Sequence, residues 1–115
     1  MDLTDSEFTA GQRWISNTES ELGLGIVIEF ADRRVTLSFP AAGERRVYAS
    51  DNAPLSRVMY EIGETIRSAD GDSLQITERL EANGCFIYAG DAEDGSPGII
   101  PELDLDSFVQ FSRPL

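Results

Sequence analysis

The sequence predicts an all-β chain made of two small antiparallel barrels in tandem. Three patterns in its 115 residues carry this prediction. Apolar and polar residues alternate strictly along Arg34–Phe39, as they do in a half-buried strand. Asn83-Gly84 is the strongest two-residue signal for a β-hairpin. Gly11–Ser16 is echoed by Gly63–Ser68, 52 residues later, with Gly, a large apolar residue and Ser in the same places.

The first half is organised around a hairpin within Leu22–Pro40, where only Ala31-Asp32-Arg33 separates two strand-like runs. Pro40 ends the second run because proline cannot donate to a strand ladder. A Ser-x-x-Glu pattern at Ser16 predicts at most one helical turn in the loop that follows. The predicted strands are Gly11–Ser16, Ile26–Phe30, Arg34–Phe39, Arg45–Ala49 and Leu55–Tyr60, although the last also fits helical spacing.

The second half repeats this order with weaker patterns. Its predicted strands are Gly63–Ser68, Leu74–Leu80, Cys85–Ala89 and two short segments at Leu103/Leu105 and Val109/Phe111, with a loop at Asp91–Gly98. The predicted domains are therefore a polar lead-in at residues 1–10, a first barrel at 11–61 and a second barrel at 62–115. Each barrel is near the lower size limit for a stable core.

The charge of the chain limits its possible functions. The formal net charge is −12, and all nine basic residues are arginine. Residues 1–60 carry six of these arginines and a net charge of −3, whereas residues 61–115 have a net charge of −9. Non-specific nucleic-acid binding needs a basic surface, which this chain lacks. Without lysine or histidine, there is no phosphate-loop lysine, histidine base or histidine metal ligand.

The remaining composition indicates a cytoplasmic protein. No apolar run approaches the roughly 18 residues of a membrane span. The acidic N-terminus lacks the features of a signal peptide, and the single Cys85 excludes an internal disulfide. We therefore expect no membrane association and no cofactor, metal or catalytic residue in this chain.

Four segments carry a resemblance to a known family: GQRWISNTESELGLGIV, VTLSFP, GERRVYA and APLSRVMY. Together they resemble the N-terminal region of the RapA (HepA) family, bacterial RNA-polymerase-associated ATPases of the Swi/Snf helicase-like class. The resemblance covers Gly11 to Leu115 and is most specific in the first fifty residues. It implies two Tudor-like or KOW-like barrels of the SH3-like type, placed ahead of the ATPase lobes.

The same resemblance implies a function in transcription. Members of that family bind core RNA polymerase and use ATP to promote polymerase recycling, and their N-terminal region is implicated in polymerase contact and in restraining the ATPase. This sequence has no Gly-x-x-x-x-Gly-Lys loop and no Asp-Glu-x-His box. We therefore expect a non-enzymatic interaction module whose partners are core RNA polymerase and the ATPase lobes of the same full-length protein. The alternative is a nucleic-acid-binding barrel that uses the arginines of the first half.

The candidate partner-binding residues are Arg34, Arg45, Arg46 and Trp14. The arginines are concentrated on two neighbouring predicted strands, where they would attract an acidic protein surface or a phosphate backbone. Adjacent residues of a strand face opposite ways, so at most one of Arg45 and Arg46 joins a given face. All three could also be solvated arginines that balance nearby acids. Trp14 could anchor a partner or fill the barrel core.

Three further patterns have plainer explanations. Phe30, Phe39, Tyr48 and Tyr60 could form an aromatic cage, although the phase of Phe39 favours the core. Acidic residues between Asp70 and Asp94 do not follow the spacing of a calcium loop, so a solvated acidic surface is expected. Cys85 is expected to be a small buried hydrophobe, because no histidine is available to activate it.

Overall fold

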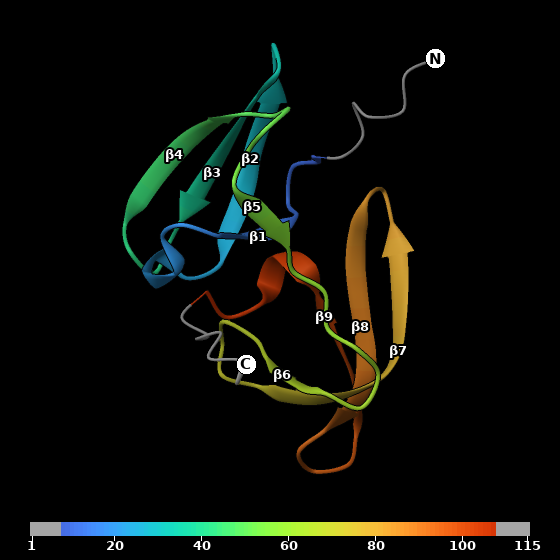
Figure 1. Ribbon diagram of the computed structural model, residues 1–115. Coiled ribbons are helices and arrows are strands. Elements are labelled where there is room, and N and C mark those ends of the chain that lie inside the picture. Colours follow the sequence, from blue (N-terminus) through green and yellow to red (C-terminus); the bar gives the residue numbers. More distant parts are fainter. Residues whose placement is uncertain (1–7, 108–115) are drawn as a thin grey trace. The chain divides into compact units, whose positions relative to one another are not determined.

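The computed structural model describes residues 8–107, which form two antiparallel sheets and no α-helix (Figure 1). These residues divide into two compact units. The first unit contains residues 8–58 and Ser107, and the second is Met59–Asp106. The all-β prediction is confirmed, with the only helical turns in the described residues being η2 (Ser20–Leu22) and η3 (Glu102–Asp104).

The first unit is one five-stranded sheet with the order β4-β3-β2-β1-β5. Its strands are β1 (Arg13–Ser16), β2 (Gly25–Ala31), β3 (Arg34–Phe39), β4 (Glu44–Ala49) and β5 (Leu55–Arg57). Ala31 pairs with Arg34, so the β2–β3 loop has two residues. Both loop residues have positive φ, as a type I′ hairpin turn requires. β5 pairs with β1, which makes it the predicted closing strand, although it is shorter than expected.

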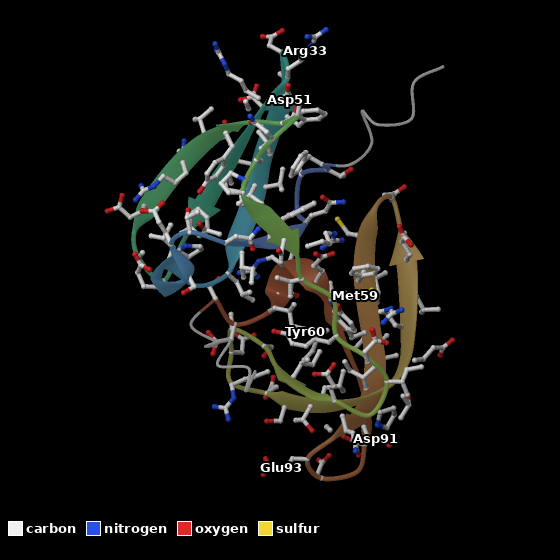
Figure 2. The ribbon with its side chains drawn as sticks, viewed as in Figure 1. Arg33, Asp51, Met59, Tyr60, Asp91 and Glu93 are labelled. Atoms are coloured by element: carbon white, nitrogen blue, oxygen red, sulfur yellow. The ribbon has the colours of Figure 1, made fainter. Side chains whose placement is uncertain are left out.

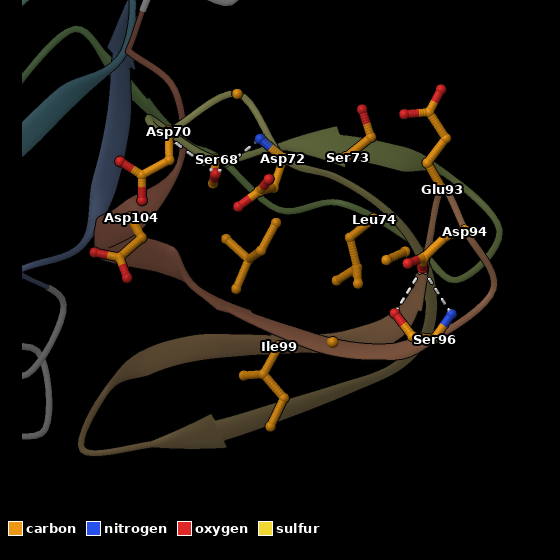
Figure 3. Close-up of a pocket in the computed structure, with 14 residues that line it drawn as sticks. Ser68, Asp70, Asp72, Ser73, Leu74, Glu93, Asp94, Ser96, Ile99 and Asp104 are labelled. Atoms are coloured by element: carbon orange, nitrogen blue, oxygen red, sulfur yellow. Dashed lines mark hydrogen bonds between the residues drawn. The ribbon is translucent and has the colours of Figure 1, made fainter.

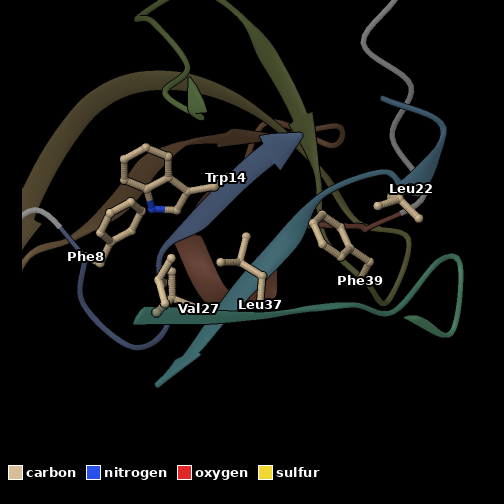
Figure 4. Close-up of a cluster of buried hydrophobic side chains, with 7 residues drawn as sticks. Phe8, Trp14, Leu22, Val27, Leu37 and Phe39 are labelled. Carbon is tan, nitrogen blue, oxygen red and sulfur yellow. The ribbon is translucent and has the colours of Figure 1, made fainter. Parts of the chain in front are cut away.

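The core of the first unit lies on the inner face of this sheet (Figure 4). The alternation along β3 buries Val35, Leu37 and Phe39 completely, as the period of two predicts. The buried cluster consists of Phe8, Trp14, Leu22, Val27, Val35, Leu37 and Phe39. A bulge between Val27 and Glu29 shifts the register of β2 against β3.

The second unit is a four-stranded sheet with the order β6-β7-β8-β9. Its strands are β6 (Thr65–Arg67), β7 (Ser73–Ala82), β8 (Cys85–Ala92) and β9 (Pro97–Pro101). Asn83-Gly84 forms the two-residue β7–β8 turn that the sequence predicts. A bulge between Ile76 and Glu78 matches the bulge of β2. Gly90 is required beside it, because a Cβ there would lie 1.8 Å from the Gln75 carbonyl oxygen.

The echo between the two halves of the sequence is also present in the backbone. Gly11 and Gly63 both have positive φ, 97° and 98°, and their N–H groups donate to the carbonyls of Val27 and Ile76 at 2.9 and 2.8 Å. Val27 and Ile76 are the last residues before the two bulges. The glycines therefore begin both units in the same way.

The serines that end the two echoed segments are also equivalent. The Ser16 hydroxyl accepts hydrogen bonds from the N–H groups of Thr18 and Glu19, and the Ser68 hydroxyl accepts them from Asp70 and Asp72. Ser16 pairs with Leu55 of β5, and Ser68 forms an isolated bridge with Leu105. Leu105 is thus a fifth strand reduced to one residue.

The end of the second unit corrects the strand predictions. The segment Pro97–Pro101 is strand β9, not the end of a loop, and Leu103 lies in η3 rather than in a strand. The acidic, glycine- and proline-containing sequence of Asp91–Gly98 predicts a loop, yet β9 begins within it at Pro97. At the edge of a sheet, a residue whose N–H faces away from the ladder can be proline without losing a bond. Val109 and Phe111 lie outside the described residues.

Candidate partner-binding surface

Two of the predicted arginines share the outer face of the first sheet. This arginine face consists of the outward residues of β3 and β4: Arg34, Thr36, Ser38, Arg45, Val47 and Ala49. Arg34 pairs with Ala49, and Arg45 pairs with Ser38. The two arginines therefore lie at opposite ends of the face, separated by about 13 Å along β4 at the usual rise of a strand.

The centre of the arginine face is apolar. Val47 pairs with Thr36, and its side chain is 60% exposed although it is aliphatic. A shallow hollow of about 240 Å³ lies beside it, lined by Glu29, Ala31, Asp32, Arg34, Thr36 and Val47. The face thus has an exposed apolar residue, Val47, between Arg34 and Arg45, while Glu29 and Asp32 line the hollow on the side of Arg34.

Both arginines of the face are available to a partner. Arg34 and Arg45 are exposed, and neither forms an ion pair with another residue in the range 8–107. Arg33 lies next to Arg34 at the tip of the β2–β3 hairpin, and its carbonyl accepts a hydrogen bond from Ser50 N at 2.9 Å. Figure 2 shows Arg33 and Asp51 at this same end of the first sheet.

Arg46 does not join the arginine face. It lies on the other side of β4, together with Tyr48, as the alternation of strand residues requires. Its guanidinium forms ion pairs with Glu44 at 2.8 Å and with Glu19 at 3.3 Å. The hydrogen bonds that the guanidinium donates to Glu19 and Glu44 raise the pKa of Arg46. Arg46 therefore joins β4 to the loop that contains η2.

Trp14 lies in the core of the first unit and is 6% exposed. Its ring packs against Phe8 with 4.6 Å between ring centroids. The indole Nε1–H donates to Gln12 Oε1 at 2.9 Å, and the same oxygen accepts a hydrogen bond from Thr9 N. Trp14 thus fixes the start of β1 through packing and a satisfied polar group.

The four aromatic residues considered for a cage do not form one. Phe39 is fully buried in the core of the first unit. Tyr60 belongs to the second unit and packs edge-on against Tyr88, with 6.0 Å between ring centroids. A cage needs ring faces open to a ligand cation, and these rings face other side chains.

The second unit contains a larger, acidic hollow of about 550 Å³ (Figure 3). Its acidic lining residues are Asp70, Asp72, Glu93, Asp94 and Asp104, and Leu74 and Ile100 contribute apolar surface. Hydrogen bonds from the Ser96 hydroxyl and N–H lower the pKa of Asp94. Among residues 8–107, no three carboxylate, thiol or imidazole groups lie close enough to hold a metal ion. The sequence indicated an acidic surface here but did not indicate a hollow.

Cys85 is a half-buried cysteine at the start of β8. Within the described part of the chain, no helix is long and apolar enough to cross a membrane.

Comparison with protein families identifies relatives over nearly the whole chain. Residues 8–58 match the model "RapA N-terminal Tudor like domain 1", and residues 60–115 match "RapA N-terminal Tudor like domain". Curated relatives include the RNA polymerase-associated protein RapA of Pectobacterium atrosepticum, which is 46% identical over 108 residues, and that of Proteus mirabilis, which is 48% identical over 110 residues. These alignments cover 93% of this chain and 11% of each relative. The chain thus spans about a tenth of the length of the curated relatives it matches.

Proposed function

The chain belongs to the RapA family, in which it corresponds to the tandem N-terminal Tudor-like domains, and on this basis we propose that it is a docking module for core RNA polymerase. The relatives are named for their association with RNA polymerase. Both matched models describe Tudor-like domains, which supports a non-catalytic role for these residues. A polymerase partner would place the chain in the bacterial cytoplasm.

The arginine face is the proposed contact surface. Arg34 and Arg45 are the two exposed arginines that share one sheet face with an exposed apolar residue, Val47. In a chain with a net charge of −12, Arg34 and Arg45 are the positions on this face where an acidic partner surface would meet attraction, although Glu29 and Asp32 lie near Arg34. Trp14 contributes through the packing that holds β1 in place.

The proposal includes an effect on the motor of a longer polypeptide. The resemblance to RNA-polymerase-associated ATPases implies ATPase lobes in the full-length protein, and a module docked on the polymerase would modulate them. This chain alone would then bind polymerase without hydrolysing ATP. Core polymerase and the ATPase lobes of the same protein are therefore the two expected partners.

The association rate with core polymerase tests the proposed surface. Arg34→Glu and Arg45→Glu should each slow association, most strongly at low salt, because rim charges act mainly on encounter rate. Melting temperatures should be nearly unchanged, since surface substitutions of this kind usually alter stability by only about 0.5 kcal/mol. Arg67→Glu is the matched control, because it makes the same charge change at an exposed arginine of β6 in the second unit.

Arg46 is left unchanged in this test. A glutamate there would bring a third carboxylate beside Glu19 and Glu44, so any loss of binding could come from a distorted strand. Unchanged low-salt association rates for both Arg34→Glu and Arg45→Glu would contradict the proposed surface. Equal slowing by Arg67→Glu would show that only the net charge matters.

A further inference from the structure

The open edge of β4 distinguishes the first unit from the second. β4 and β5 are the edge strands of the first sheet, and β6 and β9 are those of the second. β5 and β6 have only three residues each, whereas β4 has six and contains no proline. Figure 1 shows β4 at the margin of its sheet. Native proteins usually shorten or block such edges, because unpaired N–H and C=O groups bind further strands.

The register shows which backbone groups of β4 face this edge. Ser50 N donates to the Arg33 carbonyl, and hydrogen-bonded pairs alternate along an antiparallel ladder. The β3–β4 register has no bulge, so residues 44, 46 and 48 bond to β3. The backbone groups of Arg45, Val47 and Ala49 therefore point away from the sheet.

Most of these outward groups have no partner among the described residues. The Arg45 carbonyl accepts a hydrogen bond from the Arg46 side chain at 3.2 Å, and the Ala49 carbonyl accepts one from Asn52 N at 3.4 Å. The three N–H groups and the Val47 carbonyl have no hydrogen bond within residues 8–107. A carbonyl oxygen has two lone pairs, so all three positions can still bond to an added strand.

The corresponding edge of the second unit is blocked. Ala92 N donates to the Ser96 carbonyl, and the same alternation then leaves Pro97, Ile99 and Pro101 facing outward on β9. Two of these three residues have no N–H group. β9 thus offers one donor where β4 offers three, although the two strands occupy equivalent places in their sheets.

We propose that β4 binds an extended segment of an acidic partner by antiparallel strand addition, with the partner's outward side chains in the order acidic, apolar, acidic. This inference rests on the proposed docking function and specifies how the arginine face is used. Main-chain hydrogen bonds to Arg45, Val47 and Ala49 supply affinity, as in other strand-addition complexes. The side-chain order follows from Arg45 at one end, Val47 in the middle and Arg34 beside Ala49 at the other end.

Charge favours this partner over a second copy of the chain. If two β4 strands paired antiparallel about Val47, Arg45 of one copy would lie opposite Ala49 of the other. Ala49 is itself flanked by Arg34 on β3. Arg45 of one copy and Arg34 of the other would then lie two strands apart at both ends of the interface, which places like charges near each other. A partner segment with an acidic side chain at each of these two positions would be attracted to the arginines instead of repelled.

The peptide experiment uses the full chain and a capped peptide. Every second residue of the peptide is threonine, and the residues between the threonines are glutamate, valine and glutamate, in that order. We expect amide chemical-shift changes and slowed hydrogen exchange at Arg45, Val47 and Ala49, with Ile99 of β9 unaffected as the internal control. A peptide of the same composition with both glutamates moved to the opposite strand face should bind more weakly. Equal binding of the two peptides, or changes centred elsewhere, would overturn the proposal.

A proline substitution tests the backbone contribution directly. Val47→Pro removes an N–H that has no intramolecular partner, and it should weaken peptide binding about tenfold, the effect of losing one or two hydrogen bonds. Val47→Thr keeps the N–H and should bind within about twofold of the wild type. Circular dichroism checks that Val47→Pro is folded. If Val47→Pro is unfolded, the test of the proposal is the binding of the two peptides to the wild-type chain.

Core polymerase separates this inference from the proposed function. Loss of polymerase binding by both Val47→Pro and Arg34→Glu supports strand addition. If only Arg34→Glu loses binding, the docking surface stands and strand addition is wrong. If neither loses binding, the docking surface is wrong as well. Concentration-dependent dimerisation that Val47→Pro abolishes would identify the occupant as a second copy and overturn the acidic-partner proposal.

Discussion

Tyr48 carries a buried hydroxyl oxygen with no hydrogen-bond partner among the described residues. It lies on the inner side of β4, near the ion pairs of Arg46. Burial raises the pKa of Tyr48 above its ordinary value of 10.0. An unpartnered buried hydroxyl costs free energy, so this position is a local weakness in the first unit.

Tyr48→Phe should therefore leave the stability at pH 7 unchanged or raise it by up to about 1 kcal/mol. The pKa is higher in the folded state, so the neutral phenol favours folding below about pH 10, and this contribution is lost as the pH rises through the folded-state pKa. The variant should lose less stability than the wild type as the pH rises above about 10. Thermal denaturation across this range measures both effects. A clear loss of stability at pH 7 would indicate a hydrogen bond to the hydroxyl.

At the residue scale, the sequence predicted strand faces well and burial less well. The alternation rule correctly separated Arg45 from Arg46, and it placed Phe39 in the core with Val35 and Leu37. The sequence did not reveal the ion pairs of Arg46, because Glu19 is 27 residues away and lies in a different element. It also left Trp14 open, since an apolar strand residue can face either the core or a partner.

At the scale of elements, the two hairpin turns form a natural comparison. Both have two residues with positive φ, Asp32-Arg33 in the first unit and Asn83-Gly84 in the second. Asn-Gly suits this type I′ turn, whereas an arginine at φ 63° is strained. The first hairpin therefore forms despite its turn residues, through the pairing and burial of β2 and β3.

Arg33→Gly should stabilise the first unit by about 0.5–1 kcal/mol, because glycine adopts positive φ without steric strain but has a larger entropy in the unfolded chain. Arg33→Ala is the matched control, since it removes the same charge without relieving the strain. Urea denaturation of the three proteins gives the free energies of unfolding. Equal stabilisation by both variants would assign the effect to charge rather than to the backbone.

Strand prediction failed at β9, because this strand forms through its pairing with β8 rather than through its own sequence pattern. β9 contains two prolines and follows a loop of turn-forming residues, so its local sequence resembles a connection. It is a strand because β8 pairs with it from Ile87 to Asp91, a long-range interaction that local propensity does not report. β2, β3 and β4 were predicted correctly because alternation, turn residues and length all agreed.

At the scale of the whole molecule, charge favours the docking function over the nucleic-acid-binding one. A nucleic-acid-binding barrel would need several arginines on one surface, and the first sheet places only Arg34 and Arg45 together on its outer face. The net charge of −12 adds a repulsive field around any phosphate backbone. Two phosphate contacts are few compared with those of typical DNA-binding proteins.

The chain should therefore bind random duplex DNA weakly at physiological salt, with a dissociation constant above about 10⁻⁴ M, which is weaker than typical non-specific binding. Fluorescence anisotropy with a labelled duplex measures this. Arg34→Glu provides the control, because it should abolish any residual binding at low salt if the arginine face is responsible. Submicromolar binding that resists added salt would instead favour the nucleic-acid function.

The tandem organisation could be predicted because the echo between Gly11–Ser16 and Gly63–Ser68 reflects a shared backbone arrangement. The reduction of the fifth strand to Leu105 could not, because one bridging residue leaves no periodic pattern. The candidate surface was predicted in part. Arg34 and Arg45 followed from charge and alternation, but the open edge of β4 depends on strand order, which only the structure provides.

The equivalent glycines and serines of the two units have an evolutionary consequence. They are what the duplication of a single ancestral unit would leave behind, since two unrelated barrels have no reason to begin with the same hydrogen bonds. In a solitary ancestor, the edge strand equivalent to β4 and β9 would have had to serve recognition and resist aggregation at once. After duplication, one copy could acquire prolines at that strand while the other kept free donors, so the two demands no longer fell on the same residues.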